Sequence, residues 1–113
     1  MHELAITQSM FDIVLKQAEK AHAKKVTKIN LVIGEMTGVV ADSVQFYLDF
    51  MTKDTIAEGA AVSFRIVPAK AQCRNCNRIF ELPEFDWTCP NCKGTIIDVI
   101  AGKELFVESI EVD

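Results

Sequence analysis

Several residue types on which other classes of protein depend are scarce in this chain. It has two histidines among 113 residues and a net charge of −4, so a broad basic surface for nucleic-acid phosphates is not expected. No apolar run approaches the roughly 20 residues needed to cross a bilayer, and no basic leader opens the sequence. We therefore expect a cytoplasmic protein with no membrane span and no nucleic-acid partner.

What remains is the composition of a soluble globular protein. Half of the residues are apolar and a quarter are charged, so nothing suggests disorder. A chain of 113 residues can form one ordinary domain, or a small domain that carries a metal-stapled module.

The four cysteines form two pairs of the Cys-x-x-Cys type. Cys73-Arg-Asn-Cys76 and Cys89-Pro-Asn-Cys92 are separated by twelve residues. Paired thiolates from two such turns can converge on one ion, and Zn²⁺ accepts a tetrahedral shell of four sulfurs in a closed structural site. Two disulfides are the alternative, but a reducing compartment opposes them. Iron in a rubredoxin-like site stays open, and a colourless purified protein would exclude ferric iron.

Two segments have the period of an amphipathic helix. Residues 4–23 carry apolar side chains at three- and four-residue steps or their sums, which predicts one long helix. Its stripe consists of Leu4, Phe11, Val14, Leu15, Ala18 and Ala21. A second helix is predicted to begin at Asp42 or Ser43, either of which can cap it, and to end at Glu58-Gly59. Its stripe consists of Val44, Tyr47, Leu48 and Met51, with Phe46 and Phe50 beside it.

Three segments alternate with the period of a strand that has one buried face. They are residues 26–34, residues 62–66 before Pro68, and residues 105–112 after the turn at Gly102. The order strand, helix, strand favours a crossover with the first two strands parallel, although an antiparallel arrangement is also open. The third strand is expected to complete the same sheet.

The segment of residues 71–98 differs from the rest of the chain. It holds both cysteine pairs and has too little apolar mass for a core, so metal binding must supply most of its folding free energy. We expect residues 1–70 and 99–113 to form one α/β domain, into which residues 71–98 are inserted as a zinc-binding domain that hinges as a unit. The expected fold class is α+β: a small three-stranded sheet with two helices, plus an inserted four-cysteine, zinc-ribbon-like module. The large side chains expected to shield its sulfurs are Phe80, Leu82, Phe85 and Trp87.

The chain opens Met1-His2-Glu3-Leu4, which suggests a second kind of metal chemistry. A histidine at position two can chelate an ion through its imidazole together with the α-amine and a deprotonated amide. Nitrogen donors in or near a plane suit Ni²⁺ or Cu²⁺. The alternative is an exposed histidine before a helix.

The same features, taken together, resemble one family over essentially the whole chain. The opening Met1-His2-Glu3-Leu4, the order of elements, the Glu58-Gly59 pair, the cysteine pairs and the closing Ser109-Ile110-Glu111-Val112 are similar to the HypA/HybF family of hydrogenase maturation factors. The resemblance implies a nickel metallochaperone for [NiFe] hydrogenase that works beside the GTPase HypB on the hydrogenase large-subunit precursor. Some members of the family also serve urease, so urease maturation proteins are further candidate partners.

The resemblance also assigns residues to two metal sites. The family's nickel-binding start falls on Met1, His2 and Glu3, with His2 as the side-chain ligand and the amides of His2 and Glu3 as nitrogen donors. Its zinc cysteines fall on Cys73, Cys76, Cys89 and Cys92. Some relatives carry histidines beside these cysteines, but this module has none, so an oxygen from Glu3, from water or from a partner is the expected further nickel ligand.

Three other functions compete with a nickel carrier. A zinc-ribbon module that binds a protein or nucleic acid is supported by Arg74, Arg78 and Lys93 but opposed by the acidic total. A rubredoxin-like electron carrier would be excluded if the purified protein were colourless. A zinc enzyme needs an open coordination position, which four cysteines do not leave, and no set of side chains suggests a nucleophile. We therefore expect the protein not to be an enzyme.

Overall fold

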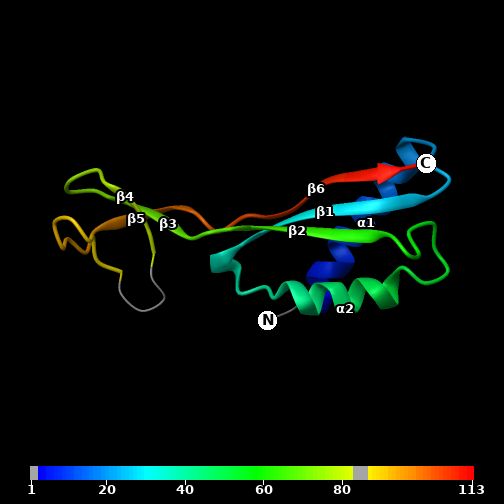
Figure 1. Cartoon of the computed structure of the whole chain (residues 1–113), viewed down its shortest axis with the longest axis horizontal. Helices are drawn as coiled ribbons and strands as arrows, with labels where there is room; N and C mark the ends of the chain where they lie inside the picture. Colours follow the sequence, from blue (N-terminus) through cyan, green and yellow to red (C-terminus); the bar gives the residue numbers. More distant parts are fainter. Residues whose placement is uncertain (1–2, 83–86) are drawn as a thin grey trace.

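The chain forms two small sheets that lie end to end along its length (Figure 1). The computed structural model describes residues 3–82 and 87–113. Its extents are 55 × 25 × 18 Å, so the molecule is more than twice as long as it is wide. The first sheet carries both helices, and the second carries the four cysteines. The expected fold class is thereby confirmed.

The first helix, α1, spans Glu3–Lys20 and buries the centre of its predicted stripe. Phe11, Val14 and Ala18 are buried, whereas the two ends of the stripe, Leu4 and Ala21, are exposed. The helix ends three residues earlier than predicted because His22 adopts a left-handed conformation, with φ of 53°. The N–H of His22 bonds to the carbonyl of Glu19, and that of Ala23 to the carbonyl of Ala18, which is the Schellman arrangement.

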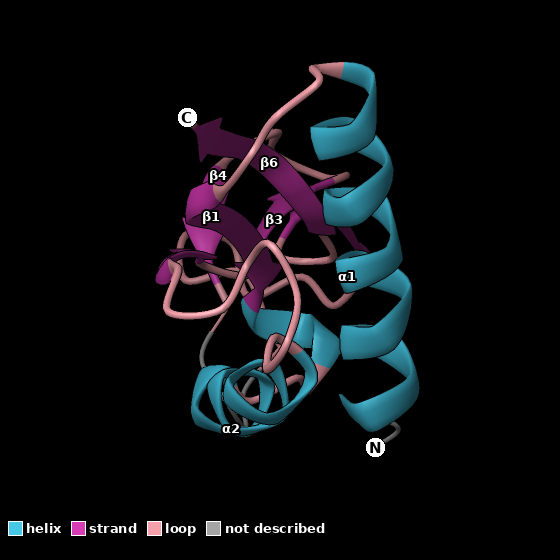
Figure 2. Cartoon of the chain, turned by 90° about the vertical axis from the view of Figure 1, so that its right-hand side faces the viewer, coloured by secondary structure: helices cyan, strands magenta, loops and turns pink. Residues whose placement is uncertain are grey.

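The first sheet has the strand order β2-β1-β6. Strand β1 (Val26–Gly34) pairs in parallel with β2 (Ala61–Val67) and antiparallel with β6 (Leu105–Val112). The predicted parallel crossover and the third strand are both confirmed. Both helices lie on one side of this sheet, as Figure 2 shows.

The second helix, α2, spans Ala41–Met51 and follows a short 3₁₀ turn, η1, at Glu35–Thr37. The prediction that Asp42 or Ser43 caps α2 is wrong, because Val40 is the N-cap and the helix carries no side-chain cap there. The predicted end is also wrong. The hydroxyl of Thr55 bonds to the carbonyl of Thr52 at 2.6 Å, and a series of turns replaces the helix between Met51 and Gly59.

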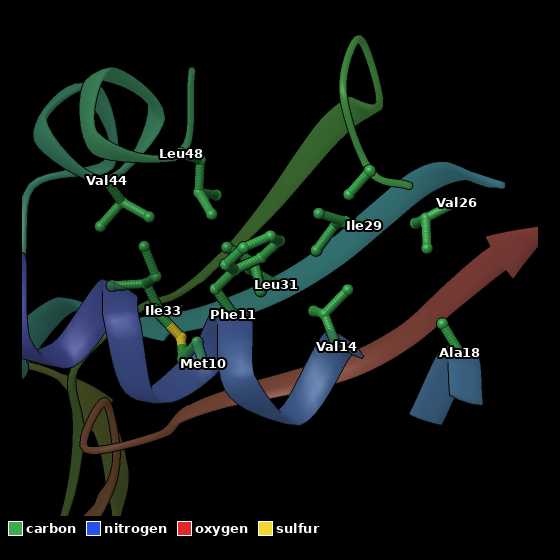
Figure 3. Packing of buried hydrophobic residues seen from close by; sticks show 11 residues of the cluster. Met10, Phe11, Val14, Ala18, Val26, Ile29, Leu31, Ile33, Val44 and Leu48 are labelled. Atoms are coloured by element: carbon green, nitrogen blue, oxygen red, sulfur yellow. The ribbon is translucent and has the colours of Figure 1, made fainter. Parts of the chain in front are cut away.

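The core of the first sheet lies between β1 and the two helices (Figure 3). Ile29, Leu31 and Ile33, the alternating residues of β1, are almost completely buried. Side chains from all three elements meet there, and they include Phe11 and Val14 of α1 and Val44 and Leu48 of α2 (Figure 3). The buried face of β1 therefore forms the centre of the core against which both helices pack.

The second sheet was not predicted strand by strand. It has the order β4-β3-β5, with β3 at Lys70–Cys73, β4 at Ile79–Glu81 and β5 at Ile97–Ala101, all antiparallel. Its small core contains Phe80 and Leu82 together with Cys73 and Cys89, in agreement with their predicted role. Trp87 is 48% exposed and lies outside this core. Phe85 falls outside the described residues.

The two sheets are connected at η1. The N–H of Met36 bonds to the carbonyl of Gly102 at 2.7 Å, and the side chain of Met36 packs against the core of the second sheet. The Glu35 carboxylate accepts the N–H of Ala69 at 3.3 Å. A loop that precedes α2 therefore contacts both chain crossings between the sheets. None of the helices among the described residues is long and apolar enough to cross a membrane.

Candidate metal centre

The two cysteine pairs are presented by turns with the same hydrogen bonds. In the first, the N–H of Asn77 bonds to the carbonyl of Cys73 at 2.9 Å, and the N–H of Cys73 to the carbonyl of Arg78 at 2.9 Å. In the second, Lys93 bonds to Cys89 at 2.8 Å, and Cys89 to Gly94 at 2.9 Å, at the equivalent positions. The equivalence makes the two turns copies of one structural unit.

Each turn closes through a residue in the left-handed region. Asn77 has φ of 63° and Lys93 has φ of 59°. Asparagine tolerates this conformation, but for lysine it costs about 1–2 kcal/mol. Gly94, which follows Lys93, leaves room for the sulfurs, since a Cβ there would lie 3.3 Å from the Sγ of Cys92. The second turn thus holds local strain beside its cysteines, which is usual at functional sites.

The four sulfur atoms converge on one point. All four Sγ atoms lie within 4.8 Å of one another, with 3.5 Å between Cys73 and Cys92 and 3.6 Å between Cys76 and Cys89. In a tetrahedron with Zn–S bonds of about 2.3 Å, the sulfurs lie roughly 3.8 Å apart. The arrangement fits a four-thiolate metal ion. It does not fit disulfides, and all four cysteines, which lie in the described part of the chain, are free.

Hydrogen bonds to sulfur favour the thiolate form that a metal requires. The backbone N–H of Asn75 donates to the Sγ of Cys73 at 3.4 Å, and its side-chain amide donates to the Sγ of Cys92 at 3.8 Å. The backbone N–H of Arg78 and the amide of Asn91 lower the pKa of Cys76 to about 6. Asn75 and Asn91 occupy the same position in the two Cys-x-x-Cys turns, a repeat that the sequence displays and that sequence reasoning missed.

The four cysteines differ in their burial. Cys73 and Cys89 are fully buried, and Cys92 is exposed at the rim. Four thiolates from β3 and the two turns would together supply the tetrahedral shell of one ion.

The basic residues near the cysteines are not all available to a ligand. The guanidinium of Arg74 forms a bidentate pair with the carboxylate of Asp98, with N···O distances of 2.8–3.0 Å. The pair raises the pKa of Arg74 and lowers that of Asp98. Arg78 and Lys93 are exposed. Because Arg74 is already paired with Asp98, only Arg78 and Lys93 remain of the three basic residues that the sequence suggested for phosphate binding.

The residues predicted to bind nickel belong to the start of the chain, away in sequence from the cysteine turns. Met1 and His2 fall outside the described residues, and Glu3 is the half-buried first residue of α1. The hydroxyl of the buried Thr7 donates to the carbonyl of Glu3 at 2.6 Å and fixes the first turn. Both views of the chain place the start of α1 beside α2 (Figures 1 and 2). Among residues 3–82 and 87–113, the cysteine cluster is the one group of three or more side chains arranged to hold a metal.

Comparison with known proteins decides the family. The model of a family described as "Hydrogenase/urease nickel incorporation, metallochaperone, hypA" matches residues 1–112. The chain belongs to the HypA family. It is 48% identical over 115 residues to the hydrogenase maturation factor HypA of Caldanaerobacter subterraneus subsp. tengcongensis, with all of both chains covered. It is 47% identical over 113 residues to that of Dehalococcoides mccartyi, covering 100% of this chain and 95% of the relative.

Two solved HypA structures share the fold. A solution structure of a HypA protein superimposes with a TM-score of 0.72 at 19% identity, covering 99% of this chain and 96% of the other. The solution structure of the nickel metallochaperone HypA from Helicobacter pylori gives 0.68 at 19% identity, covering 99% and 97%. At this level of identity the likeness concerns the fold alone.

Proposed function

We propose that the protein is a nickel metallochaperone that binds Ni²⁺ at its N-terminus and helps to insert it into [NiFe] hydrogenase during maturation. The observation that carries this function is the match of the HypA family model to residues 1–112. The curated relatives at 47–48% identity, both named hydrogenase maturation factor HypA, support it. The protein acts by carrying and transferring an ion, without a catalytic site of its own.

The four cysteines hold a structural Zn²⁺ in this proposal. The fit rests on the converging sulfur atoms and on the N–H groups that point at them. Cys73, Cys76, Cys89 and Cys92 would supply the four ligands, and the ion would tie the two turns and β3 together. Zinc has no redox chemistry, so the site maintains shape. In this division, residues 71–98 are the zinc-binding domain, and residues 1–70 with 99–113 are the nickel-binding domain. The second sheet reaches slightly past these bounds, to Lys70 in β3 and Ala101 in β5.

The transferable Ni²⁺ is cargo, and its ligands are the amine of Met1, the imidazole of His2 and the amides of His2 and Glu3. The first N–H groups of a helix have no partner within the helix, so the amide of Glu3, the first residue of α1, is not needed for its hydrogen bonding. Nitrogen donors at a chain end leave coordination positions open to an incoming ligand, which suits transfer. A closed cage of four thiolates would retain the ion.

The partners that follow from this function are a HypB-type GTPase and the [NiFe] hydrogenase large-subunit precursor. The family description includes urease, so urease maturation proteins are further proposed partners. The carrier releases nickel by ligand exchange to the next protein in the transfer.

Calorimetric titration of the zinc-loaded protein with Ni²⁺ tests the nickel site. The native N-terminus should bind stoichiometrically, and both His2→Ala and a one-residue N-terminal extension should abolish or alter binding. His22→Asn is the matched control, because it removes the chain's other histidine and asparagine tolerates the left-handed conformation at that position. Unchanged binding in His2→Ala and in the extended protein, or none in the native protein, would leave a zinc-stapled interaction module as the better description.

The pH dependence of nickel binding is a second test. Imidazole and α-amine, with ordinary pKa values of about 6.5 and 8, must lose protons to bind Ni²⁺. Affinity should therefore fall between about pH 8 and pH 6. Equal affinities at the two pH values would exclude this donor set.

A further inference from the structure

The outward face of α2 exposes two phenylalanines one helical turn apart. Figure 3 shows Val44 and Leu48 of the same helix directed into the core. Phe46 and Phe50 are 70% and 74% exposed, the two highest values among the large apolar side chains of the described residues. Single exposed apolar residues are common, but an adjacent aromatic pair is typical of a surface that another molecule covers.

Each ring contacts one neighbouring side chain. The ring of Phe46 packs edge-on against Tyr47, with centroids 5.6 Å apart and planes at 73°. The Nζ of Lys53 lies 5.9 Å from the centroid of Phe50. Both rings therefore remain largely open to a partner that approaches from solvent.

A shallow hollow beside Phe46 has the chemistry of a site for a cationic side chain. It has a volume of about 200 Å³ and is lined by Asp42, Ser43, Phe46 and Tyr47. A lysine or arginine can lay its apolar stem on the two rings and bring its charged end to the Asp42 carboxylate.

The charge around the aromatic pair is also negative. Residues 40–54 contain three carboxylates, Asp42, Asp49 and Asp54, and one ammonium, that of Lys53, so they carry −2 of the chain's net charge of −4. Asp49 lies on the same exposed surface, where it accepts the amide of Gln45 at 2.7 Å. A basic partner is therefore favoured over an acidic one.

We propose that the outer face of α2 is the docking site for a basic amphipathic helix of a partner protein. Phe46 and Phe50, spaced four residues apart, form a ridge that fits the groove between side chains of a second helix. Lysine or arginine residues that flank the partner's apolar stripe meet the α2 carboxylates, and one enters the hollow beside Phe46. A second copy of α2 is a poor occupant, because it would bring Asp42 and Asp49 against their equivalents.

The test uses two fluorescein-labelled helical peptides and the full zinc-loaded chain. One peptide has leucines at helical spacing with lysines elsewhere, and the other has glutamate in place of every lysine. Fluorescence anisotropy should show binding of the lysine peptide that weakens with salt, and at least tenfold weaker binding of the glutamate peptide. The double variant Phe46→Ala, Phe50→Ala should lose at least tenfold in affinity for the lysine peptide, and Asp42→Asn should lose several-fold.

Ile13→Ala is the matched control, because Ile13 is a 47% exposed apolar residue on the other helix. It should bind the lysine peptide as the native chain does. The alanine variants should melt close to the native temperature, since alanine favours a helix and the replaced side chains are exposed. Equal binding of the two peptides, or equal losses in Ile13→Ala and the double variant, would overturn the proposal, as would no binding at all.

Two further measurements separate the alternatives. A dimer of the native chain seen by sedimentation, and abolished in the double variant, would show that a second copy covers this face and would overturn the proposal. Nickel titration of the double variant should match that of the native chain. If the double variant loses peptide binding but keeps nickel binding, the docking surface is separate from the nickel site. The docking proposal and the nickel proposal can therefore fail independently of each other.

Discussion

Gly34 and Gly102 are in direct contact where the two sheets meet. A Cβ atom on Gly34 would collide with the backbone carbonyl of Gly102, although the φ of −76° and ψ of 141° at Gly34 suit any residue. The N–H of Gly34 also bonds to the carbonyl of Glu104 at 2.5 Å. The requirement for glycine at this position is therefore one of space.

Replacement of Gly34 by alanine should destabilise the protein by about 1–3 kcal/mol, as expected for a side chain forced into a packed contact. The neighbouring atoms belong to the backbone of residues 102–104, which cannot rotate away as a flexible side chain could. Urea unfolding followed by circular dichroism measures the change.

Gly59→Ala provides the comparison, because a Cβ there meets no atom within 4 Å and the only obstacle is the φ of 78°. Its cost should be about 1 kcal/mol from the left-handed backbone. If Gly34→Ala costs no more than Gly59→Ala, the contact between Gly34 and Gly102 contributes nothing.

An ion pair spans the central strand on the open face of the first sheet. Arg65 on β2 and Glu108 on β6 pair at 2.7 Å, with β1 between them. Val32 of β1, which lies beside Arg65 in the strand register, is fully buried although it points away from the helices. We predict that Arg65→Ala destabilises the protein by about 1 kcal/mol, chiefly because Val32 loses its cover.

Arg65→Met and Glu108→Gln separate packing from charge. Methionine keeps the apolar stem over Val32, so Arg65→Met should lose less than Arg65→Ala in urea unfolding. Glu108→Gln breaks only an exposed ion pair and should cost less than about 1 kcal/mol. Equal losses in the two arginine variants would show that the charge, and not the cover, stabilises this face.

The elements that sequence patterns predicted are those in which one physical cause decides the structure. Burial alone explains the alternation of Ile29, Leu31 and Ile33. This pattern predicted β1 with the ends that the structure shows, Val26 and Gly34. The spacing of the cysteines indicated converging thiols for a similar reason, since each Cys-x-x-Cys turn is a local unit.

The features that sequence patterns missed depend on contacts between distant residues. The end of α2 depends on turns beyond Met51, so a capping rule applied to Gly59 alone placed it too late. The second sheet has a core of few residues, and its strands β3 and β4 are too short to show a period. Phe46 and Phe50 lie beside the buried stripe of α2, and only the structure shows that nothing among the described residues covers them.

Removal of the metal should disorder the second sheet and leave the first sheet folded. The apolar core around Cys73 and Cys89 is small, so metal ligation supplies most of its stability. Trp87, the chain's single tryptophan, lies two residues before Cys89 and reports on this region. Addition of a strong chelator should shift its emission to longer wavelength, while ellipticity at 222 nm from α1 and α2 is retained.

Readdition of one equivalent of Zn²⁺ to the chelated protein should restore the Trp87 emission. The variant Cys76→Ser, Cys92→Ser should show the shifted emission without chelator and should not respond to zinc. Parallel loss of the helical signal and the Trp87 signal would contradict independent folding of the two sheets, and so the proposed division of the chain.

Loss of the Asn91 amide should make zinc release occur at higher pH. The N–H of Arg78 and, next, the amide of Asn91 lower the pKa of Cys76 to about 6. Without bound metal, this thiolate stabilises the folded module fully above the ordinary thiol pKa of 9.0, and the contribution is lost as pH falls through about 6. In Asn91→Ala the pKa of Cys76 rises, so protons displace zinc at a higher pH. A colorimetric chelator, with Thr95→Ala as control, measures the midpoint, and an equal midpoint in both variants would refute the role of Asn91.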